Sequence, residues 1–378
     1  MMRRSVFSPN AHIRGSLVIF PRFALEDWFA RYKSSCHINM GSSDVEPIAL
    51  ADLRDAQQSH DAITLGYGGV LGSETLRASI ASTHAGVDSE HVHSFTGATE
   101  AVFCLNAAMV GPGDDVVVVT PTYQLLVDLP RSFGASVTHV PLTHEVGGWS
   151  LSTDSVAAAM TPATRMVVVN SPNNPTGWVA EHTQLEELAA LTSAVGAVLV
   201  GDEVYRGLGR RTSSVVDVDE SAVSIGSVSK TLGVAGLRTG WIVARDSALR
   251  DRLRTARYWT TLSSSPVTDA LALSALAAAP TLLGRARRIV EANNGLLESL
   301  ADDRGDVRYS PPHGGTTGYL ELLDNEAEVV ARRLAVDHGV FTVPSTAMLA
   351  PGQHLRIALG RDGLADGLDA LQETLDVT

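Results

Sequence analysis

The chain has 378 residues, and its 29 Lys and Arg against 42 Asp and Glu give a formal net charge of −13. This balance argues against a protein that binds nucleic-acid backbones, because phosphates are bound by clustered cations. Hydrophobic residues at 44% and charged residues at 19% exclude a mainly disordered chain, and the length suffices for about two domains.

The N-terminal region has no targeting sequence that we recognise. Its two arginines are followed by an apolar run at 17–20 that is shorter than a signal peptide requires. The longest stretch of small apolar residues, 270–284, is too short to span a membrane. Cys36 and Cys104 are too few for a disulfide scaffold or a cysteine zinc site. We therefore expect a cytoplasmic protein that binds neither membranes nor nucleic acids.

From about residue 74 to 245, short Val- and Ile-rich runs alternate with segments of helical spacing. We expect buried strands at 116–119, 166–169, 197–200, 223–225 and 241–243, and helices at 99–110, 124–133 and 184–195. This alternation predicts an α/β fold with a mostly parallel sheet flanked by helices. Thr183 and Glu186 have the spacing of a capping box, and Gly196 suits the C-terminal cap of the same helix.

The rest of the chain predicts a second, smaller α+β domain. Helices are expected within 246–303, followed by strands at 320–322, 340–343 and 355–359 and helices at 329–337 and 364–375. We assign residues 49–282 to the large domain and residues 1–48 and 283–378 to the small domain. The first 45 residues have no strand–helix rhythm, and we expect them to pack on the small domain and at the mouth of the site.

A lysine follows the strand predicted at 223–225. Lys230 lies among small hydroxyl and glycine residues, with Arg238 eight positions later. An amine whose pKa is lowered by burial can form an imine with an aldehyde, and Ser227, Ser229 and Arg238 offer donors suited to a phosphate. A P-loop is one alternative, although Ser229 stands where its glycine belongs. A surface lysine in a loop is the other.

Acidic and amide side chains follow two further strands. Asp202 comes after the strand 197–200, where a buried carboxylate needs a cationic partner such as a protonated pyridine nitrogen. Tyr205 is close enough in sequence to reach the same ligand. Asn174 lies in a proline-rich turn after the strand 166–169, which can aim its amide. The alternatives are that Asp202 caps the next helix and that the turn has no other role.

Two weaker features concern anions and metals. Ala98 and Thr99 follow Gly97 at the start of a helix, where free backbone N–H groups favour an anion; no dinucleotide glycine spacing is present. His91 and His93 alternate on an expected strand like a metal pair. They have no third ligand nearby in sequence, so we predict a structural role and no metal site.

The order and separation of these segments resemble the class I/II pyridoxal-phosphate-dependent aminotransferases, which have the aspartate aminotransferase fold (fold type I). The resemblance covers nearly the whole chain. It implies pyridoxal 5′-phosphate as cofactor, bound by the large domain, and an amino-acid substrate. Lys230 would hold the cofactor as a Schiff base and move the proton, Asp202 would pair with the pyridinium nitrogen, and Tyr205 would act beside them as the third catalytic residue.

The resemblance also implies roles for the remaining site residues. Asn174 and Tyr205 would bind the phenolic oxygen of the cofactor, and Tyr123 would stack on its ring. Arg356 would bind the substrate α-carboxylate, near Asn174 and Gly41. The phosphate would be bound by Ala98, Thr99, Ser227, Ser229 and Arg238. Tyr67 would reach the phosphate of a partner subunit, which implies a homodimer with shared active sites.

A weaker resemblance concerns the reaction. The segments 25–32, 260–266 and 314–317 look similar to capreomycidine-synthase-like members, which eliminate and cyclise on a hydroxyarginine substrate. We therefore expect an aminotransferase, with a cyclase, eliminase or oxidase of an arginine-like amino acid in secondary-metabolite biosynthesis as the alternative. A regulatory module that keeps the cofactor site is a third possibility, but no helix-turn-helix segment accompanies it.

Overall fold

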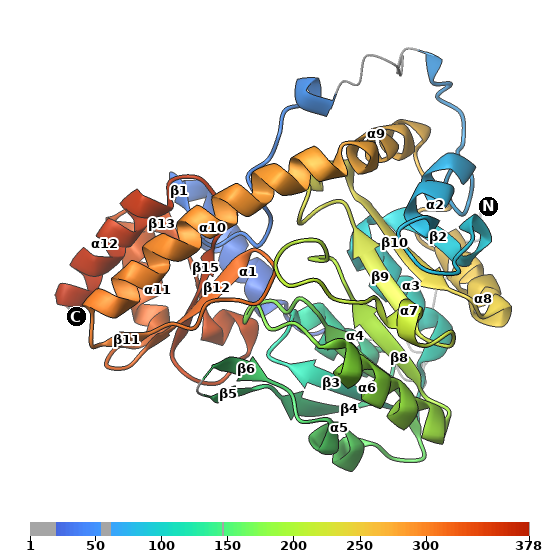
Figure 1. Ribbon diagram of the computed structural model, residues 1–378, viewed down its shortest axis with the longest axis horizontal. Coiled ribbons are helices and arrows are strands. Elements are labelled where there is room, and N and C mark those ends of the chain that lie inside the picture. Colours follow the sequence, from blue (N-terminus) through green and yellow to red (C-terminus); the bar gives the residue numbers. More distant parts are fainter. Residues whose placement is uncertain (1–19, 54–61, 146, 378) are drawn as a thin grey trace, which may run out of the picture.

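The computed structural model describes residues 20–53, 62–145 and 147–377. Its main sheet has seven strands in the order β2-β10-β9-β8-β7-β3-β4 (Figure 1). Their bounds are β2 Val92–Thr96, β3 Asp115–Thr120, β4 Ser136–Pro141, β7 Thr164–Asn170, β8 Val198–Asp202, β9 Val223–Ser227 and β10 Thr239–Ala244. Only β10 is antiparallel to its neighbours, which confirms the predicted mostly parallel sheet.

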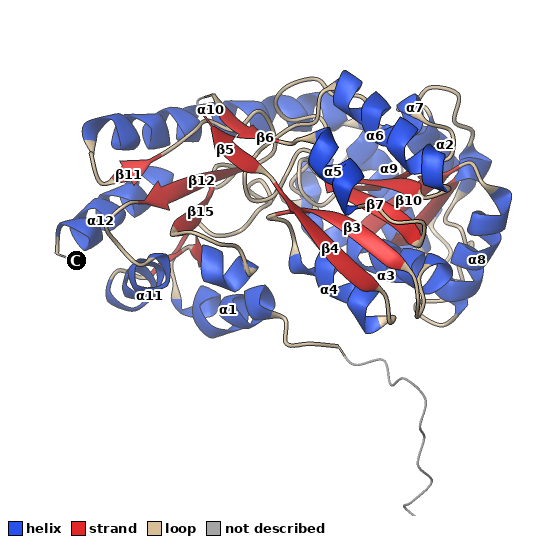
Figure 2. Ribbon diagram, turned by 90° about the horizontal axis from the view of Figure 1, so that it is seen from below, coloured by secondary structure: helices blue, strands red, loops and turns tan. Residues whose placement is uncertain are grey.

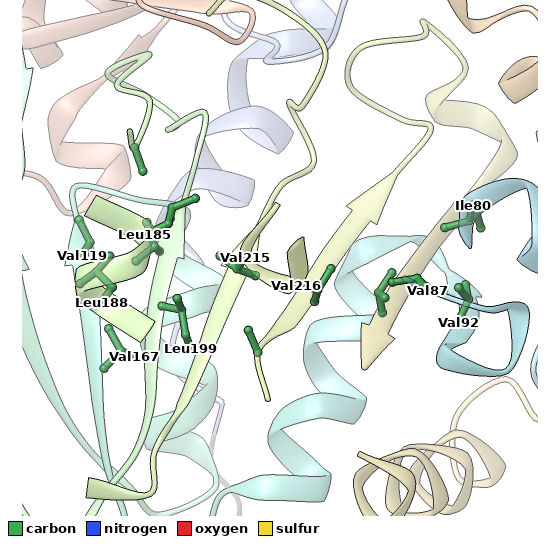
Figure 3. Packing of buried hydrophobic residues seen from close by; sticks show 14 of the residues in the cluster. Ile80, Val87, Val92, Val119, Val167, Leu185, Leu188, Leu199, Val215 and Val216 are labelled. Carbon is green, nitrogen blue, oxygen red and sulfur yellow. The ribbon is translucent and has the colours of Figure 1, made fainter. Parts of the chain in front are cut away.

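Helices cover both faces of this sheet (Figure 2). One face carries α2 Glu74–Ala81, α5 Thr153–Ala159, α6 His182–Val195, α7 Val215–Val218 and α9 Pro266–Ala277, and the other carries α3 Gly97–Met109, α4 Gln124–Ser132 and α8 Ser247–Tyr258. Strand side chains alternate between the faces, so Val117 and Val119 join one apolar cluster while Val116 and Val118 join the other. Figure 3 shows the first cluster, where Leu185 and Leu188 of α6 lie near Val167 of β7.

The structure corrects the predicted cap of α6. The helix begins at His182, and the reciprocal capping bonds join Glu181 and Gln184, with the Glu181 N–H donating to Gln184 Oε1 over 3.0 Å. Thr183 and Glu186 have the same spacing but lie inside the first turns. The predicted end is confirmed, because Gly196 adopts the left-handed conformation with φ 72°.

A smaller lobe is built around a four-stranded sheet in the order β11-β12-β15-β14. Its elements are α10 Ala279–Asp303, β11 Val307–Arg308, β12 Thr317–Leu322, α11 Ala327–Asp337, β13 Val340–Phe341, β14 Val343–Pro344, β15 His354–Ala358 and α12 Leu364–Asp376. A separate apolar cluster fills it. The helix α10 runs from the main sheet into this lobe without a break at residue 282, so the domain boundary at 282/283 stays a prediction (Figure 1).

The N-terminal arm joins the smaller lobe. It contains a helix that was not predicted, α1 Ala24–Tyr32, and a short strand, β1 Ile38–Asn39, that pairs in parallel with β13. The two-stranded hairpin of β5 Thr143–Glu145 and β6 Gly148–Ser150 completes the strands. Among the described residues no single helix passes as a membrane span; α9 and α10 pass only as a pair bent by 70°.

Candidate active site

A cavity of about 330 Å³ opens beyond the carboxyl ends of β7, β8 and β9. Parallel α/β sheets place ligands at this edge because the loops after the strands meet there. The lining includes the predicted site residues Ala98, Thr99, Tyr123, Asn174, Asp202, Tyr205, Ser227, Ser229, Lys230, Arg238 and Arg356. Residues as far apart in the sequence as Ala98 and Arg356 thus line the same cavity.

The Lys230 side chain points into this cavity. Its Nζ donates a hydrogen bond to Ser43 Oγ over 3.1 Å. Burial lowers the pKa of the Lys230 amine, while the carboxylate of Asp44 opposes the shift. A larger fraction of the amine is therefore neutral and nucleophilic near neutral pH. Lys230 is thus not a surface lysine, and no α-helix follows it as a P-loop requires, since the chain continues through a short 3-10 turn into β10.

Asp202 is the last residue of β8 and is buried. Burial raises the pKa of its carboxyl to about 7, although Val204 N donates to Oδ1 over 3.3 Å. Among the described residues, none forms an ion pair with this carboxylate. A buried acid without a cation favours a cationic ligand, which a protonated ring nitrogen would supply. The helix-capping alternative is wrong, because the next helix, α7, is capped by Ser214.

A group of hydrogen-bond donors lines the same cavity as Lys230. The start of α3 presents backbone N–H groups, and Gly97 there has φ +82°. A Cβ at Gly97 would lie 2.4 Å from Arg238 Nη2, so the guanidinium lies directly against the helix start. The buried Ser229 Oγ has no hydrogen-bond partner among the described residues. Free N–H groups, a guanidinium and an unpartnered hydroxyl fit a phosphate.

Arg356 approaches the cavity from β15 of the smaller lobe and is only 1% exposed. Its Nη1 donates to Asn174 Oδ1 over 3.1 Å, and its Nη2 donates to the carbonyl of Gly41. The Nε atom is buried without a partner among the described residues. These bonds fix a charged fork that retains unused donors, an arrangement suited to a carboxylate.

Two tyrosines line the cavity as protonated donors. Burial raises the pKa of the Tyr205 hydroxyl, and burial together with Glu26 raises that of Tyr123. The Tyr123 hydroxyl donates to Glu26 Oε1 over 3.0 Å. Both phenols therefore remain hydrogen-bond donors at neutral pH.

Other predicted residues lie elsewhere. Gly41 does not line the cavity but contacts it through Arg356. Tyr67 is 91% exposed and lies outside the cavity. His91 and His93 do not share a strand: His91 accepts from Asp88 N in a 3-10 turn before β2, and His93 is buried within β2. Burial lowers the pKa of His93 to about 3.

The N-terminal arm contributes lining residues that the sequence analysis did not identify. They are Glu26, Phe29 and Lys33 from α1 and the turn after it, and Ser42, Ser43 and Asp44 beyond β1. A signal for the helix exists in the apolar residues Leu25, Phe29 and Tyr32, which follow the i, i+4, i+7 spacing of one helix face.

Comparison with known proteins identifies the family. The model of "Aminotransferase class I and II" matches residues 38–368. The chain belongs to this family. Pyridoxal 5′-phosphate is its cofactor, and the protein is an enzyme, which excludes the regulatory-module alternative. The donors suited to a phosphate, the amine of Lys230 and the carboxyl of Asp202 fit this cofactor.

This member of the family is similar to proteins whose names state different reactions. It is 31% identical to capreomycidine synthase of Streptomyces vinaceus over 94% of both chains. It is 29% identical to the arginine–pyruvate transaminase AruH of Pseudomonas aeruginosa over 92% of both chains. The solved structure of the PLP-dependent cyclase OrfR superimposes with a TM-score of 0.87 at 30% identity, covering 97% of this chain and 100% of that one.

Proposed function

We propose that the enzyme transfers an amino group between an α-amino acid and a 2-oxo acid. The observation that carries this proposal is that one cavity holds Lys230, the unpaired acid Asp202 and the buried fork of Arg356. An amino-acid substrate needs these three groups: an amine for proton movement, a charge for the cofactor ring and a guanidinium for the α-carboxylate.

The cofactor would be held by residues around the same cavity. Lys230 would bind its aldehyde, Asp202 would pair with the ring nitrogen, and Tyr123 would lie against the ring. Asn174 and Tyr205 would bind the phenolic oxygen. Ala98, Thr99, Ser227, Ser229 and Arg238 would bind the phosphate. When bound, the cofactor supplies an electron sink for cleavage of a bond at the substrate α-carbon.

The side chains themselves orient the substrate and move its proton. Arg356, already fixed by Asn174 and Gly41, binds the α-carboxylate through its free donors. The Lys230 amine, with its pKa lowered by burial, takes the α-proton and returns it. Asp202 keeps its negative charge next to the ring nitrogen, because an adjacent cation offsets the cost of its burial.

A second candidate is a cyclase, eliminase or oxidase that acts on an arginine-like amino acid in secondary-metabolite biosynthesis. The similarity to capreomycidine synthase and to the cyclase OrfR supports it, since both matches extend over more than nine-tenths of the chain. The same residues would serve it, because the outcome depends on which bond is broken and on access of water.

A homodimer with shared sites and a cytoplasmic location complete the proposal. The exposed ring of Tyr67 supports the first, because such a side chain is available to a partner subunit. The two free cysteines, Cys36 and Cys104, support a reducing compartment. We retain residues 49–282 as the cofactor-binding domain.

The test is a panel of amino acids given to the purified holoenzyme with pyruvate or 2-oxoglutarate, followed by absorbance and product mass spectrometry. A keto acid with transfer of the amine supports amino-group transfer, whereas loss of water with retention of the amine supports the second candidate. Lys230→Ala is expected to lose the absorbance of the covalently bound cofactor and at least about a thousandfold in turnover. Retention of both by this variant would refute the proposal.

A further inference from the structure

Glu26 is the one acidic residue lining the cavity that has neither an ion pair among the described residues nor a role toward the cofactor. Asp44 is paired with Arg361, which lies behind the cavity wall. Asp202, Arg238 and Lys230 serve the cofactor under the proposed function. The carboxylate of Glu26 has one hydrogen bond, from the neutral Tyr123 hydroxyl, and among the described residues no ion pair. Its charge is therefore available to a ligand.

The position of Glu26 is fixed by the helix that carries it. At the start of α1, Ala24 N donates to Gln124 Oε1 over 2.9 Å, which attaches the helix to α4 of the main lobe. Near its middle, Trp28 Nε1 donates to the carbonyl of Thr342 over 2.9 Å, which attaches it to the smaller lobe. Leu25 anchors the apolar face in the core. The Glu26 side chain is thus presented to the cavity by a helix that is attached to both lobes.

Glu26 lines the same cavity as Lys230 and Arg356. Its charge acts on both Lys230 and Arg356 and raises the pKa of each, in opposition to burial. Phe29, one turn later, has its ring centroid 5.9 Å from Arg356 Cζ. An amino acid with its carboxylate on Arg356 and its amine toward Lys230 can direct its side chain toward α1, where Glu26 and Phe29 line the cavity.

We propose that Glu26 selects substrates whose side chain ends in a cation, a guanidinium before an ammonium. This inference rests on the proposed function, which places the substrate α-carboxylate on Arg356. A carboxylate binds a guanidinium through two parallel hydrogen bonds and an ammonium as a point charge. The aromatic ring of Phe29, one turn after Glu26, lies near the guanidinium of Arg356. Lys33, which also lines the cavity, lies over that ring with Nζ 5.3 Å from its centroid.

The test compares two acids that lack the α-amine and therefore bind without reacting. 5-Guanidinopentanoate carries the cation, and 5-ureidopentanoate has nearly the same shape without it. Binding to the holoenzyme is measured by calorimetry. We expect the wild type to bind the guanidino acid about tenfold more tightly, and Glu26→Gln to abolish this preference while binding of the ureido acid changes by less than about twofold.

Asp27→Asn is the matched control. Asp27 lies on the same turn of α1, is paired with Arg22 and does not line the cavity, so this variant should keep the wild-type preference. Tyr123→Phe removes the hydroxyl that binds Glu26 but leaves the carboxylate, so it should keep the preference as well. If Glu26→Gln weakened the binding of both acids equally, Glu26 would only position Tyr123, and the inference would be overturned.

Three other outcomes are decisive. Equal binding of the two acids by the wild type would overturn the role of Glu26. Tighter binding of the dicarboxylate pimelate, lost in Lys33→Ala, would overturn it in favour of an anionic side chain. A preference that depends on Glu26 but survives Arg356→Ala without weaker binding would support the charge selection and refute the carboxylate site of the proposed function.

Discussion

The edge of the main sheet and the N-terminal arm both line one cavity, yet they differ in how firmly the sequence specifies them. At the sheet edge, Asp202 ends β8 and Lys230 follows β9, so their places follow from regular strands. The arm reaches the cavity through α1 and a turn after β1, where Glu26 and Ser43 lie. We infer that the sheet edge binds the cofactor and that the arm adapts the site to its substrate.

Replacement of Arg356 by Lys should have the largest effect of the three substitutions, and this effect should fall on substrate binding and not on cofactor binding. Arg356 belongs to neither the sheet edge nor the arm and should control substrate alone. We expect kcat/KM for amino acids to fall by about 10²-fold, mainly through KM, because a lysine cannot bind a carboxylate through two parallel bonds. Steady-state kinetics and cofactor absorbance measure the two effects. A loss of bound cofactor would contradict the division, since it would place Arg356 with the sheet edge.

The stability of the cofactor-free protein should reveal the buried acid at the sheet edge. Because the pKa of Asp202 is raised to about 7 in the folded protein, the folded state holds a proton that the unfolded state releases above its ordinary value of 3.8. Stability should therefore fall as pH rises from about 4 to 7, and Asp202→Asn should remove about 4 kcal/mol of this fall. Denaturant unfolding at several pH values measures it, with Asp302→Asn, at an exposed position of α10, as the comparison. Parallel pH curves for wild type and Asp202→Asn would disprove the assignment.

Ser229→Ala should have the smallest effect. The Ser229 hydroxyl is buried without a partner among the described residues, so its removal should change the free energy of unfolding little. The cofactor phosphate should lose one hydrogen bond. We expect the dissociation constant of the cofactor to rise about fivefold, measured by fluorescence titration, with the arginine preference of the arm unchanged. A change in that preference would show that the sheet edge and the arm are coupled.

The parts of the fold and the site that could be predicted from the sequence are the strands of the parallel sheet and the residues that directly follow them. Val- and Ile-rich runs fixed the strands β3 and β7, and residues after strands of a parallel sheet meet at one edge, which brought Asn174 and Asp202 together. The cap of α6 was misplaced because two overlapping segments carry the same spacing, and only the hydrogen-bond register distinguishes Glu181 from Thr183. Glu26 was missed because a nine-residue helix outside any strand–helix rhythm gives no indication of what it faces.

One guanidinium joins two separately packed cores, since Arg356 projects from the smaller lobe and bonds to Asn174 at the sheet edge. A substrate carboxylate bound by Arg356 would therefore contact the residue that connects the two lobes. Acid binding and the packing of one core against the other are then thermodynamically coupled. A substitution that displaces Arg356 by disturbing this packing should therefore also weaken acid binding.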